Sequence, residues 1–325
     1  MRLGVVDVGS NTVHLSIIEA ERGTPPLPNY STKTRLHLAE SVDENGALPA
    51  DAIDRLVDSL RAATDTCERR DVDELRVFAT AVIRDAANCD EVVKRIGKEA
   101  DVELQLLSGE EEARLMYSAA RRWFGWSSGP MVVLDIGGGS LEIASGRNEL
   151  PSFAISYPLG AGRLTREWLP DARPSGRQIR ELRDYVREEI RDAVARSRWE
   201  GTPPFAVGTS KTFRQLARLA GAAPGRAGPF VPRSLDTGDV KHWEKALAGM
   251  RPRERARQRG VSKRRARQIV AGAVVARTVM RALNIEGVAI CPWAVREGVI
   301  LSRLDAGEAA VATKEQTRLV VAAAQ

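Results

Sequence analysis

Hydrophobic and polar residues alternate with a period of two at the start of the chain. The apolar run 3–6 ends at Asp7, the segment 9–11 carries turn residues, and apolar side chains then alternate over 13–17. Because successive side chains of a strand point to opposite faces, this pattern predicts a strand, a tight turn and a second strand.

The same order of features returns near the middle of the chain. The apolar run 131–134 ends at Asp135, glycines at 137–139 form a turn, and Leu141 and Ile143 alternate after it. This weak internal repeat predicts two similar lobes, with a boundary in 125–130. The expected domains are 1–126, 127–304, and a C-terminal helix or tail at 305–325 that packs back on the first lobe.

Spacings of three and four residues between apolar side chains predict helices that alternate with further strands. Helices are expected at 49–70, 91–100, 110–124, 179–194, 213–220, 269–283 and 308–325. Strands are expected at 75–80, 102–107, 205–207 and 287–291. This order of elements is typical of an α/β protein.

The composition is that of an ordinary globular protein. The chain has 325 residues, enough for about two domains, and its 43% hydrophobic and 28% charged residues argue against disorder. The net charge of +6 suits an acidic partner without identifying one. Three cysteines and three histidines lack metal-site spacing, which makes a thiolate or histidine zinc site unexpected. With no apolar run of membrane length and no signal-peptide pattern, we expect a cytoplasmic protein without membrane contact.

Three glycine-containing turns follow apolar strands, after Asp7, after Asp135, and at Gly208-Thr209. Backbone N–H groups in such turns can form a nest for anions, and carboxylates beside bound phosphate can hold Mg²⁺. The alternatives are tight hairpins without a ligand, and acids that only cap their own turns.

Three acids open the helix predicted from residue 110. For Glu110 the favourable interaction with the helix dipole is a sufficient explanation. The alternative for such an acid is a general base that activates water. The sequence alone does not separate these roles.

Several common catalytic motifs are absent. The chain has no GxxxxGK[ST], which only the segment 208–212 superficially resembles. The glycines at 137–139 do not continue into the GxGxxG spacing of a dinucleotide site.

A basic run between residues 251 and 267 holds nine cations and one acid, Glu254. Its cations are Arg251, Arg253, Arg255, Arg257, Arg259, Lys263, Arg264, Arg265 and Arg267. One interpretation is a solvated surface, and the other is a track for a polyanion. No aromatic residues are interleaved, so specific nucleic-acid binding is not expected.

Taken together, the motifs resemble the exopolyphosphatase/guanosine pentaphosphate phosphohydrolase (Ppx/GppA) family of the actin-like ATPase superfamily. The similarity runs from residue 3 to about 301. The segments that carry it are 7–12, 79–86, 108–115, 135–142, 208–209 and 292–298.

The resemblance implies two ribonuclease-H-like lobes with the active site in the cleft between them. It implies Mg²⁺ (or Mn²⁺) held by Asp7, Asp135 and Glu142, and Glu112 as the catalytic base, with Glu111 beside it. Arg296 and Glu297 match a late motif that we expect to be mainly structural. The expected phosphate-binding residues are Gly9, Ser10, Asn11, Thr12, Arg84, Gly137, Gly138, Gly139, Ser140, Gly208, Thr209 and Lys211.

The expected activity is release of terminal phosphate from linear inorganic polyphosphate. Thr12 replaces the family's usual serine, and Lys211 stands where many members have a small residue. Longer members carry an additional C-terminal helical region, so we expect short chains as substrates here. The alternatives are a guanosine pentaphosphate phosphohydrolase, a kinase of the same superfamily, and a non-catalytic polyphosphate or alarmone sensor. A homodimer is compatible with the family.

Overall fold

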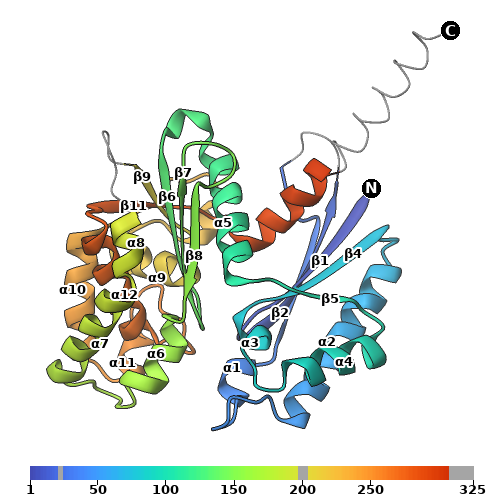
Figure 1. Cartoon of the computed structure of the whole chain (residues 1–325), viewed down its shortest axis with the longest axis horizontal. Helices are drawn as coiled ribbons and strands as arrows, with labels where there is room; N and C mark the ends of the chain where they lie inside the picture. Colours follow the sequence, from blue (N-terminus) through green and yellow to red (C-terminus); the bar gives the residue numbers. More distant parts are fainter. Residues whose placement is uncertain (21–24, 197–203, 307–325) are drawn as a thin grey trace. The chain divides into compact units, whose positions relative to one another are not determined.

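The computed structural model describes residues 1–20, 25–196 and 204–306, which form two compact α/β units (Figure 1). Unit 1 contains residues 1–79, 83–106 and the described residues from 295 onward. Unit 2 contains 80–82 and 107–294. Of the predicted tail at 305–325, residues 307–325 lie outside the described residues.

The units divide at other positions than the sequence repeat suggested. The helix after residue 108 packs on the strands of unit 2, which moves the division from 125–130 to 106/107. The helical residues 295–306 belong to unit 1, where Arg303 forms an ion pair with Glu74 at 2.7 Å. Packing partners, rather than the repeat itself, therefore define the units.

Unit 1 is built around a mixed five-stranded sheet in the order β3-β2-β1-β4-β5. Its strands are β1 (Arg2–Val8), β2 (Thr12–Glu19), β3 (Tyr30–Arg35), β4 (Glu74–Ala79) and β5 (Leu104–Leu106). Its helices are α1 (Leu38–Ser41), α2 (Ala50–Glu68) and α4 (Cys89–Ala100), and α3 (Ala81–Arg84) spans the division between the units. β1 is antiparallel to β2 and parallel to β4.

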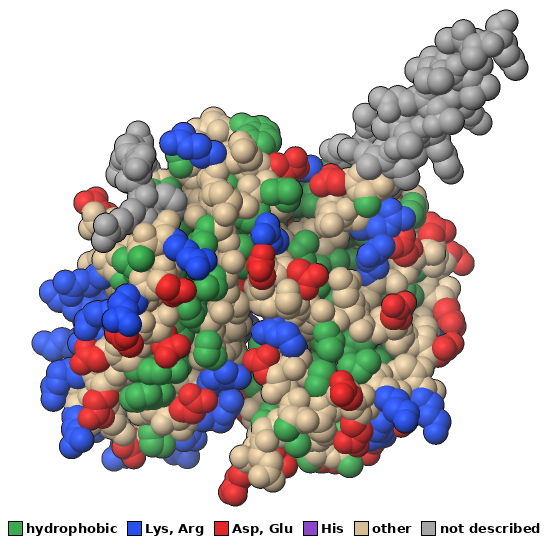
Figure 2. All heavy atoms as spheres, in the orientation of Figure 1, with side chains coloured by type: hydrophobic (Ala, Val, Ile, Leu, Met, Phe, Trp, Pro, Cys, Tyr) green, Lys and Arg blue, Asp and Glu red, His purple; other side chains and the backbone are tan. Residues whose placement is uncertain are grey.

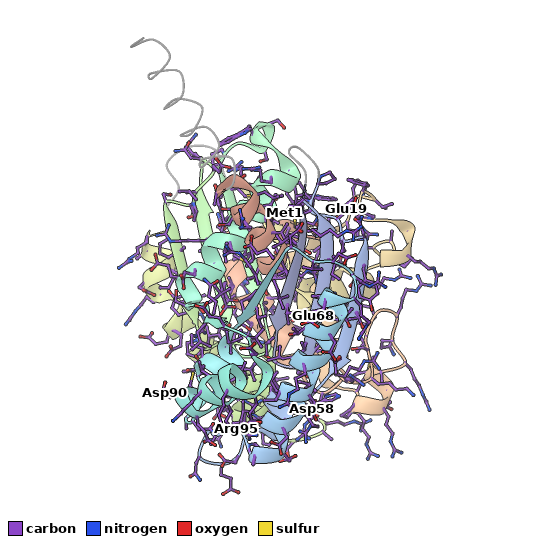
Figure 3. All side chains as sticks on the ribbon, turned by 90° about the vertical axis from the view of Figure 1, so that its right-hand side faces the viewer. Met1, Glu19, Asp58, Glu68, Asp90 and Arg95 are labelled. Carbon is purple, nitrogen blue, oxygen red and sulfur yellow. The ribbon has the colours of Figure 1, made fainter. Side chains whose placement is uncertain are left out.

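Two long amphipathic helices, α2 and α4, lie over the sheet of unit 1 in Figure 3. They bury apolar stripes and leave charged residues such as Asp58, Glu68 and Asp90 exposed. Arg95 of α4 joins the helices by an ion pair with Asp54 of α2 at 2.7 Å. The predicted helices in 49–70 and 91–100 are confirmed.

Unit 2 repeats this topology with one additional edge strand. Its sheet has the order β10-β11-β9-β6-β7-β8. Its strands are β6 (Met131–Ile136), β7 (Leu141–Gly146), β8 (Phe153–Tyr157), β9 (Phe205–Gly208), β10 (Ser234–Asp236) and β11 (Gly287–Ile290). As in unit 1, the first strand is antiparallel to the second and parallel to the fourth, so the predicted ribonuclease-H-like lobes are confirmed. The cleft between them stays a prediction.

Helices cover both faces of the second sheet (Figure 1). They are α5 (Gly109–Phe124), α6 (Ala161–Trp168), α7 (Gly176–Glu189), α8 (Arg191–Arg196), α9 (Lys211–Leu219), α10 (Thr237–Ala248), α11 (Pro252–Arg255) and α12 (Ile269–Ala282), with short 3₁₀ turns η1 (Trp126–Ser128) and η2 (Gly225–Ala227). α5 packs on β6–β8, and the nearly fully buried α12 packs against α6, α7, α9 and α10. A helix that is apolar on most sides needs such surroundings.

Candidate active site

The two hairpins that follow the repeated apolar runs have the same tight turn. In unit 1 the Gly9 N–H donates to the Thr12 carbonyl at 3.0 Å, and in unit 2 the Gly137 N–H donates to the Ser140 carbonyl at 2.9 Å. The sequence repeat therefore corresponds to a repeated local structure.

The turn at 137–140 is held by the start of α6. Four successive N–H groups reach its carbonyl oxygens over 2.9–3.2 Å, namely those of Gly160, Ala161, Gly162 and Arg163 onto Gly137, Gly138 and Gly139. In a trans peptide the C=O of one residue and the N–H of the next point in opposite directions. The N–H groups of Gly138, Gly139 and Ser140 therefore point away from α6 as a row of three, which is the geometry of an anion nest.

Close contact between α6 and this turn depends on Gly160. A Cβ atom at position 160 would lie 2.2 Å from the carbonyl carbon of Gly139, a distance that no side chain tolerates. Sequence reasoning missed Gly160. The local signal was the glycine pair in Gly160-Ala161-Gly162.

The turn of unit 1 is anchored through fewer carbonyls. The Ser10 oxygen accepts from the Ala39 N–H at 2.9 Å, and the Asn11 oxygen accepts from Leu36 and His37 at 3.1 and 3.2 Å. By the same peptide geometry, the N–H groups of Asn11 and Thr12 point away from segment 36–39. The predicted phosphate-binding residues of this turn thus expose two directed N–H groups.

Asp7, the last residue but one of β1, lies opposite His14 of β2. The His14 Nε2 atom lies 2.7 Å from the Ser31 hydroxyl, and Arg296 contacts Nδ1. Since a guanidinium only donates, Nδ1 accepts and Nε2 carries the proton. Burial, followed by the charges of Arg296 and Lys33, lowers the pKa of His14 to about 3. His14 is therefore neutral.

Burial is also the largest influence on the pKa of Asp7. It raises the pKa of this carboxyl to about 6, while Arg296 acts in the opposite direction and Glu297 adds to the rise. Arg296 and Glu297 contact each other directly. The late motif that we expected to be mainly structural thus supplies charges around Asp7.

The three acids at the start of α5 have three different environments. Glu110 forms an exposed ion pair with Arg114 at 2.6 Å. Glu111 completes a capping box, because its carboxylate accepts from the Ser108 N–H at 2.7 Å while the Ser108 hydroxyl accepts from the Glu111 N–H. The first of these bonds lowers the pKa of Glu111. Glu112 is only 5% exposed and faces the sheet.

Glu112 lies near a second buried carboxyl, Glu142. Glu142 is paired with Asp135 across β6 and β7, and one of its oxygens accepts from the Ser156 hydroxyl at 2.8 Å. Burial, and then the neighbouring charges of Glu112 and Asp135, raise the pKa of Glu142 well above its usual range. Three acids of unit 2 thus converge beside the turn at 137–140.

Asp135 combines burial with partners that favour its charge. Burial raises its pKa, whereas a hydrogen bond from the Thr209 hydroxyl and the charges of Arg214 and Arg265 act in the opposite direction. Sequence reasoning missed Arg214. It placed Arg265 in the basic run, although the Arg265 guanidinium donates to Thr212 Oγ1 at 3.3 Å.

Of the other predicted phosphate-binding residues, Lys211 is exposed at the first position of α9. Gly208 packs so tightly that a Cβ would lie 2.7 Å from the Phe213 ring. Arg84 of unit 1 forms an ion pair with Asp85 at 3.0 Å. The structure therefore groups Asp7 with the turn at 9–12, and Asp135, Glu142, Glu112 and Thr209 with the turn at 137–140.

The basic run is not a uniform surface. Arg255 is only 1% exposed, and its guanidinium donates to the carbonyl oxygens of Leu247, Ala266 and Ala172. The prediction that Arg255 belongs to a polyanion track is wrong, because its guanidinium is buried and its N–H groups donate to those carbonyl oxygens. Acidic side chains are interspersed with the basic ones over the helices of unit 2 in Figure 2.

In residues 1–20, 25–196 and 204–306, no three His, Cys, Asp or Glu side chains form a group that could hold a metal. Asp135 and Glu142 supply two neighbouring carboxyls instead, and their mutual repulsion is a reason for a divalent cation to bind. Mg²⁺ takes oxygen ligands and commonly keeps several waters, so one or two carboxylates suffice. Within the same residues, no helix has the length and apolarity to cross a membrane.

Comparison with known proteins gives consistent matches. The sequence profile of the Ppx/GppA phosphatase family matches residues 17–306. Exopolyphosphatase 1 of Mycobacterium tuberculosis is 51% identical over 305 residues, which cover 94% of this chain and 89% of that protein. The Aquifex aeolicus Ppx/GppA crystal structure is 25% identical, with a TM-score of 0.78 over 94% of this chain and 97% of that chain. An exopolyphosphatase structure from Cytophaga hutchinsonii shares the fold, at 23% identity with a TM-score of 0.83 over 94% and 98% of the two chains.

Proposed function

This chain belongs to the Ppx/GppA phosphatase family, and from that premise we propose that it is an exopolyphosphatase, a hydrolase that releases terminal phosphate from linear inorganic polyphosphate. The observation that carries the proposal is the 51% identity to mycobacterial exopolyphosphatase 1 over 94% of this chain. The arrangement of unit 2 supports it, because an anion nest and buried carboxyls lie at the end of the same hairpin.

The terminal phosphate binds to the N–H groups of Gly138, Gly139 and Ser140. These donors are fixed by α6, so they need no reorganisation when negative charge is redistributed during phosphoryl transfer. In unit 1 the N–H groups of Asn11 and Thr12 are the corresponding donors for phosphate oxygens.

Glu112 acts as the general base for water. Glu112 is buried beside Glu142, whereas the carboxylate of Glu111 accepts a hydrogen bond in the helix cap. This difference favours Glu112 as the base. The water oxygen bonds to the terminal phosphorus while the bridging P–O bond breaks on the opposite side. Glu112 accepts the water proton, and the leaving polyphosphate keeps the bridging oxygen.

The carboxyls of Asp135 and Glu142 are the residues of unit 2 that would hold Mg²⁺ (or Mn²⁺), and Asp7 of unit 1 is the further metal ligand that the family resemblance predicts. The raised pKa of each of these carboxyls reflects burial, and in Glu142 also a neighbouring like charge. A bound divalent cation would supply charge neutralisation for the phosphate oxygens.

The exposed cations of the run 251–267 are proposed to attract the remainder of the polyanion. Binding through exposed cations weakens steeply with salt, as for nucleic acids. A KM for polyphosphate that does not change with salt would exclude this role.

The direct test is phosphate release from the purified protein with Mg²⁺, using short polyphosphate, long polyphosphate, guanosine pentaphosphate and ATP in parallel. Release from polyphosphate supports the proposal, and the ratio of short to long chains defines the preferred length. Preferential release of phosphate from guanosine pentaphosphate would identify that nucleotide, rather than polyphosphate, as the substrate. Binding without release from any of them would favour a sensor.

A further inference from the structure

The turn that follows β9, residues 209–212, carries three hydroxyl side chains and superficially resembles a phosphate-binding loop. In the structure all three hydroxyls contact the last two residues of β6. Thr209 Oγ1 donates to Asp135 Oδ2 at 2.5 Å, Ser210 Oγ accepts from the Ile136 N–H at 3.3 Å, and Thr212 Oγ1 donates to the Ile136 carbonyl at 2.7 Å.

A hydroxyl has one proton to donate, and a bound phosphate requires donors. Thr209 is fully buried and its proton is engaged by the Asp135 carboxylate. Thr212 is 1% exposed and its proton is engaged by a main-chain oxygen. Neither hydroxyl therefore has a proton left for a phosphate oxygen, in contrast to the role that the sequence suggested for Thr209.

The turn is itself fixed to the sheet on one side and to α9 on the other. The Thr209 N–H donates to the Leu134 carbonyl at 3.0 Å, and Ser210 caps α9 by accepting from the Phe213 N–H. The hydroxyls thus connect the rigid start of α9 to the position where β6 ends and the turn at 137–140 begins. Side chains held in this way orient a neighbouring functional group without contacting the ligand themselves.

We propose that Thr209, with Ser210 and Thr212, forms a hydroxyl clamp that orients Asp135 for metal binding and does not bind phosphate. This inference rests on the proposed function, in which Asp135 holds the divalent cation. Thr209 is then a positioning residue. By fixing one carboxylate oxygen, it leaves the other directed for the cation.

The test is Mn²⁺ binding, measured by electron paramagnetic resonance on the full-length protein without substrate, alongside tripolyphosphate hydrolysis. Thr209→Val keeps the shape and removes the hydroxyl. We expect its Mn²⁺ affinity to fall about tenfold, the usual scale for loss of an outer partner of a metal ligand. We expect kcat to fall in parallel, with the KM for tripolyphosphate within about twofold, and Thr209→Ser to restore both.

Thr278→Val is the matched control, because Thr278 is a buried threonine of α12 whose hydroxyl donates to the Val274 carbonyl at 2.7 Å. It should leave Mn²⁺ affinity unchanged. If Thr209→Val does not fold, Ser210→Ala replaces it, with an expected loss of about threefold in Mn²⁺ affinity.

Unchanged Mn²⁺ affinity in Thr209→Val, with a higher KM for tripolyphosphate, would overturn the clamp and make Thr209 a phosphate ligand. A wild-type protein that binds no Mn²⁺ would overturn it as well. A wild-type protein that binds Mn²⁺ but releases no phosphate would contradict the proposed activity alone, since the clamp is then still measured by Mn²⁺ affinity.

Discussion

The hairpins β1–β2 and β6–β7 share a turn and an aspartate one residue before the end of the first strand, but they differ in the residue opposite that aspartate. Asp7 lies opposite His14, which is neutral and contacts Arg296, whereas Asp135 lies opposite Glu142, which lies near Glu112. The first hairpin thus places its acid opposite a neutral imidazole, with Arg296 and Glu297 near it, whereas the second places its acid opposite another carboxyl. We infer that similar scaffolds serve different tasks, with water activation in unit 2 and phosphate binding in both units.

The largest expected effect separates Glu112 from its neighbour. Glu112→Gln should lower kcat for polyphosphate about a thousandfold, because a general base contributes about 10²–10⁴ to the rate. Glu111→Gln should keep kcat within about threefold, since glutamine also completes a capping box. Equal kcat values for the two variants in a phosphate-release assay would remove the distinction between these acids.

The next effect concerns the anchoring of the second turn. Gly160→Ala should lower kcat/KM about a hundredfold, because its methyl group would displace the turn at 137–140, and misplacement by 1 Å can cost that much. Gly238→Ala is the matched control, since nothing lies within 4 Å of a Cβ at that position. Normal kinetics in Gly160→Ala would show that α6 does not determine the turn.

The carboxylate of Asp7 should destabilise unit 1 at neutral pH. Because its pKa is about 6 in the folded chain against an ordinary 3.8, the folded state binds the proton more tightly. The stabilisation that protonated Asp7 gives the folded chain is fully present below pH 3.8 and is lost as the pH rises through about 6. Asn does not ionise, so Asp7→Asn should be more stable than wild type at pH 7 by up to about 3 kcal/mol.

That gain should largely disappear near pH 4, where Asp7 is protonated in the folded chain and only partly ionised in the unfolded chain. Urea unfolding at pH 4 and pH 7 in the presence of EDTA measures the difference. A gain that is the same at both pH values would show that ionisation of Asp7 is not its cause.

A smaller effect of opposite sign is expected for His14. Its pKa of about 3 lies below the ordinary 6.5. The stabilisation that neutral His14 gives the folded chain is therefore present above pH 6.5 and is lost as the pH falls toward 3. Wild-type stability should therefore fall more between pH 7 and pH 5 than the stability of His14→Gln does. His242→Gln, at an exposed histidine, should follow the wild type in the same urea series.

Regular patterns in the sequence predicted much of the fold. The repeated apolar-acid-glycine pattern identified both hairpins, and helical spacing identified α2, α4 and α5. The polar strand β3 (Tyr30–Arg35) had no alternation to reveal it, because it is an edge strand with most side chains exposed. Edge strands often carry polar and charged side chains, which prevent the exposed edge from pairing with another chain.

The site was predictable in its loops but less so in its individual side chains. The spacing Ser108-x-x-Glu111 is a capping-box signature that could have assigned Glu111 from the sequence. Burial of Arg255, and the charges of Arg214 and Arg265 around Asp135, depend on contacts between segments distant in the chain. Local sequence does not encode such contacts.

The most direct test of the central claim is an amide NMR titration with tripolyphosphate and Mg²⁺, performed on the inactive Glu112→Gln protein. If the N–H groups of Gly138, Gly139 and Ser140 bind the terminal phosphate, their proton resonances should move downfield together and saturate, with the amides of Asn11 and Thr12 following. Shifts confined to residues 251–267, with the 138–140 amides unmoved, would contradict the account.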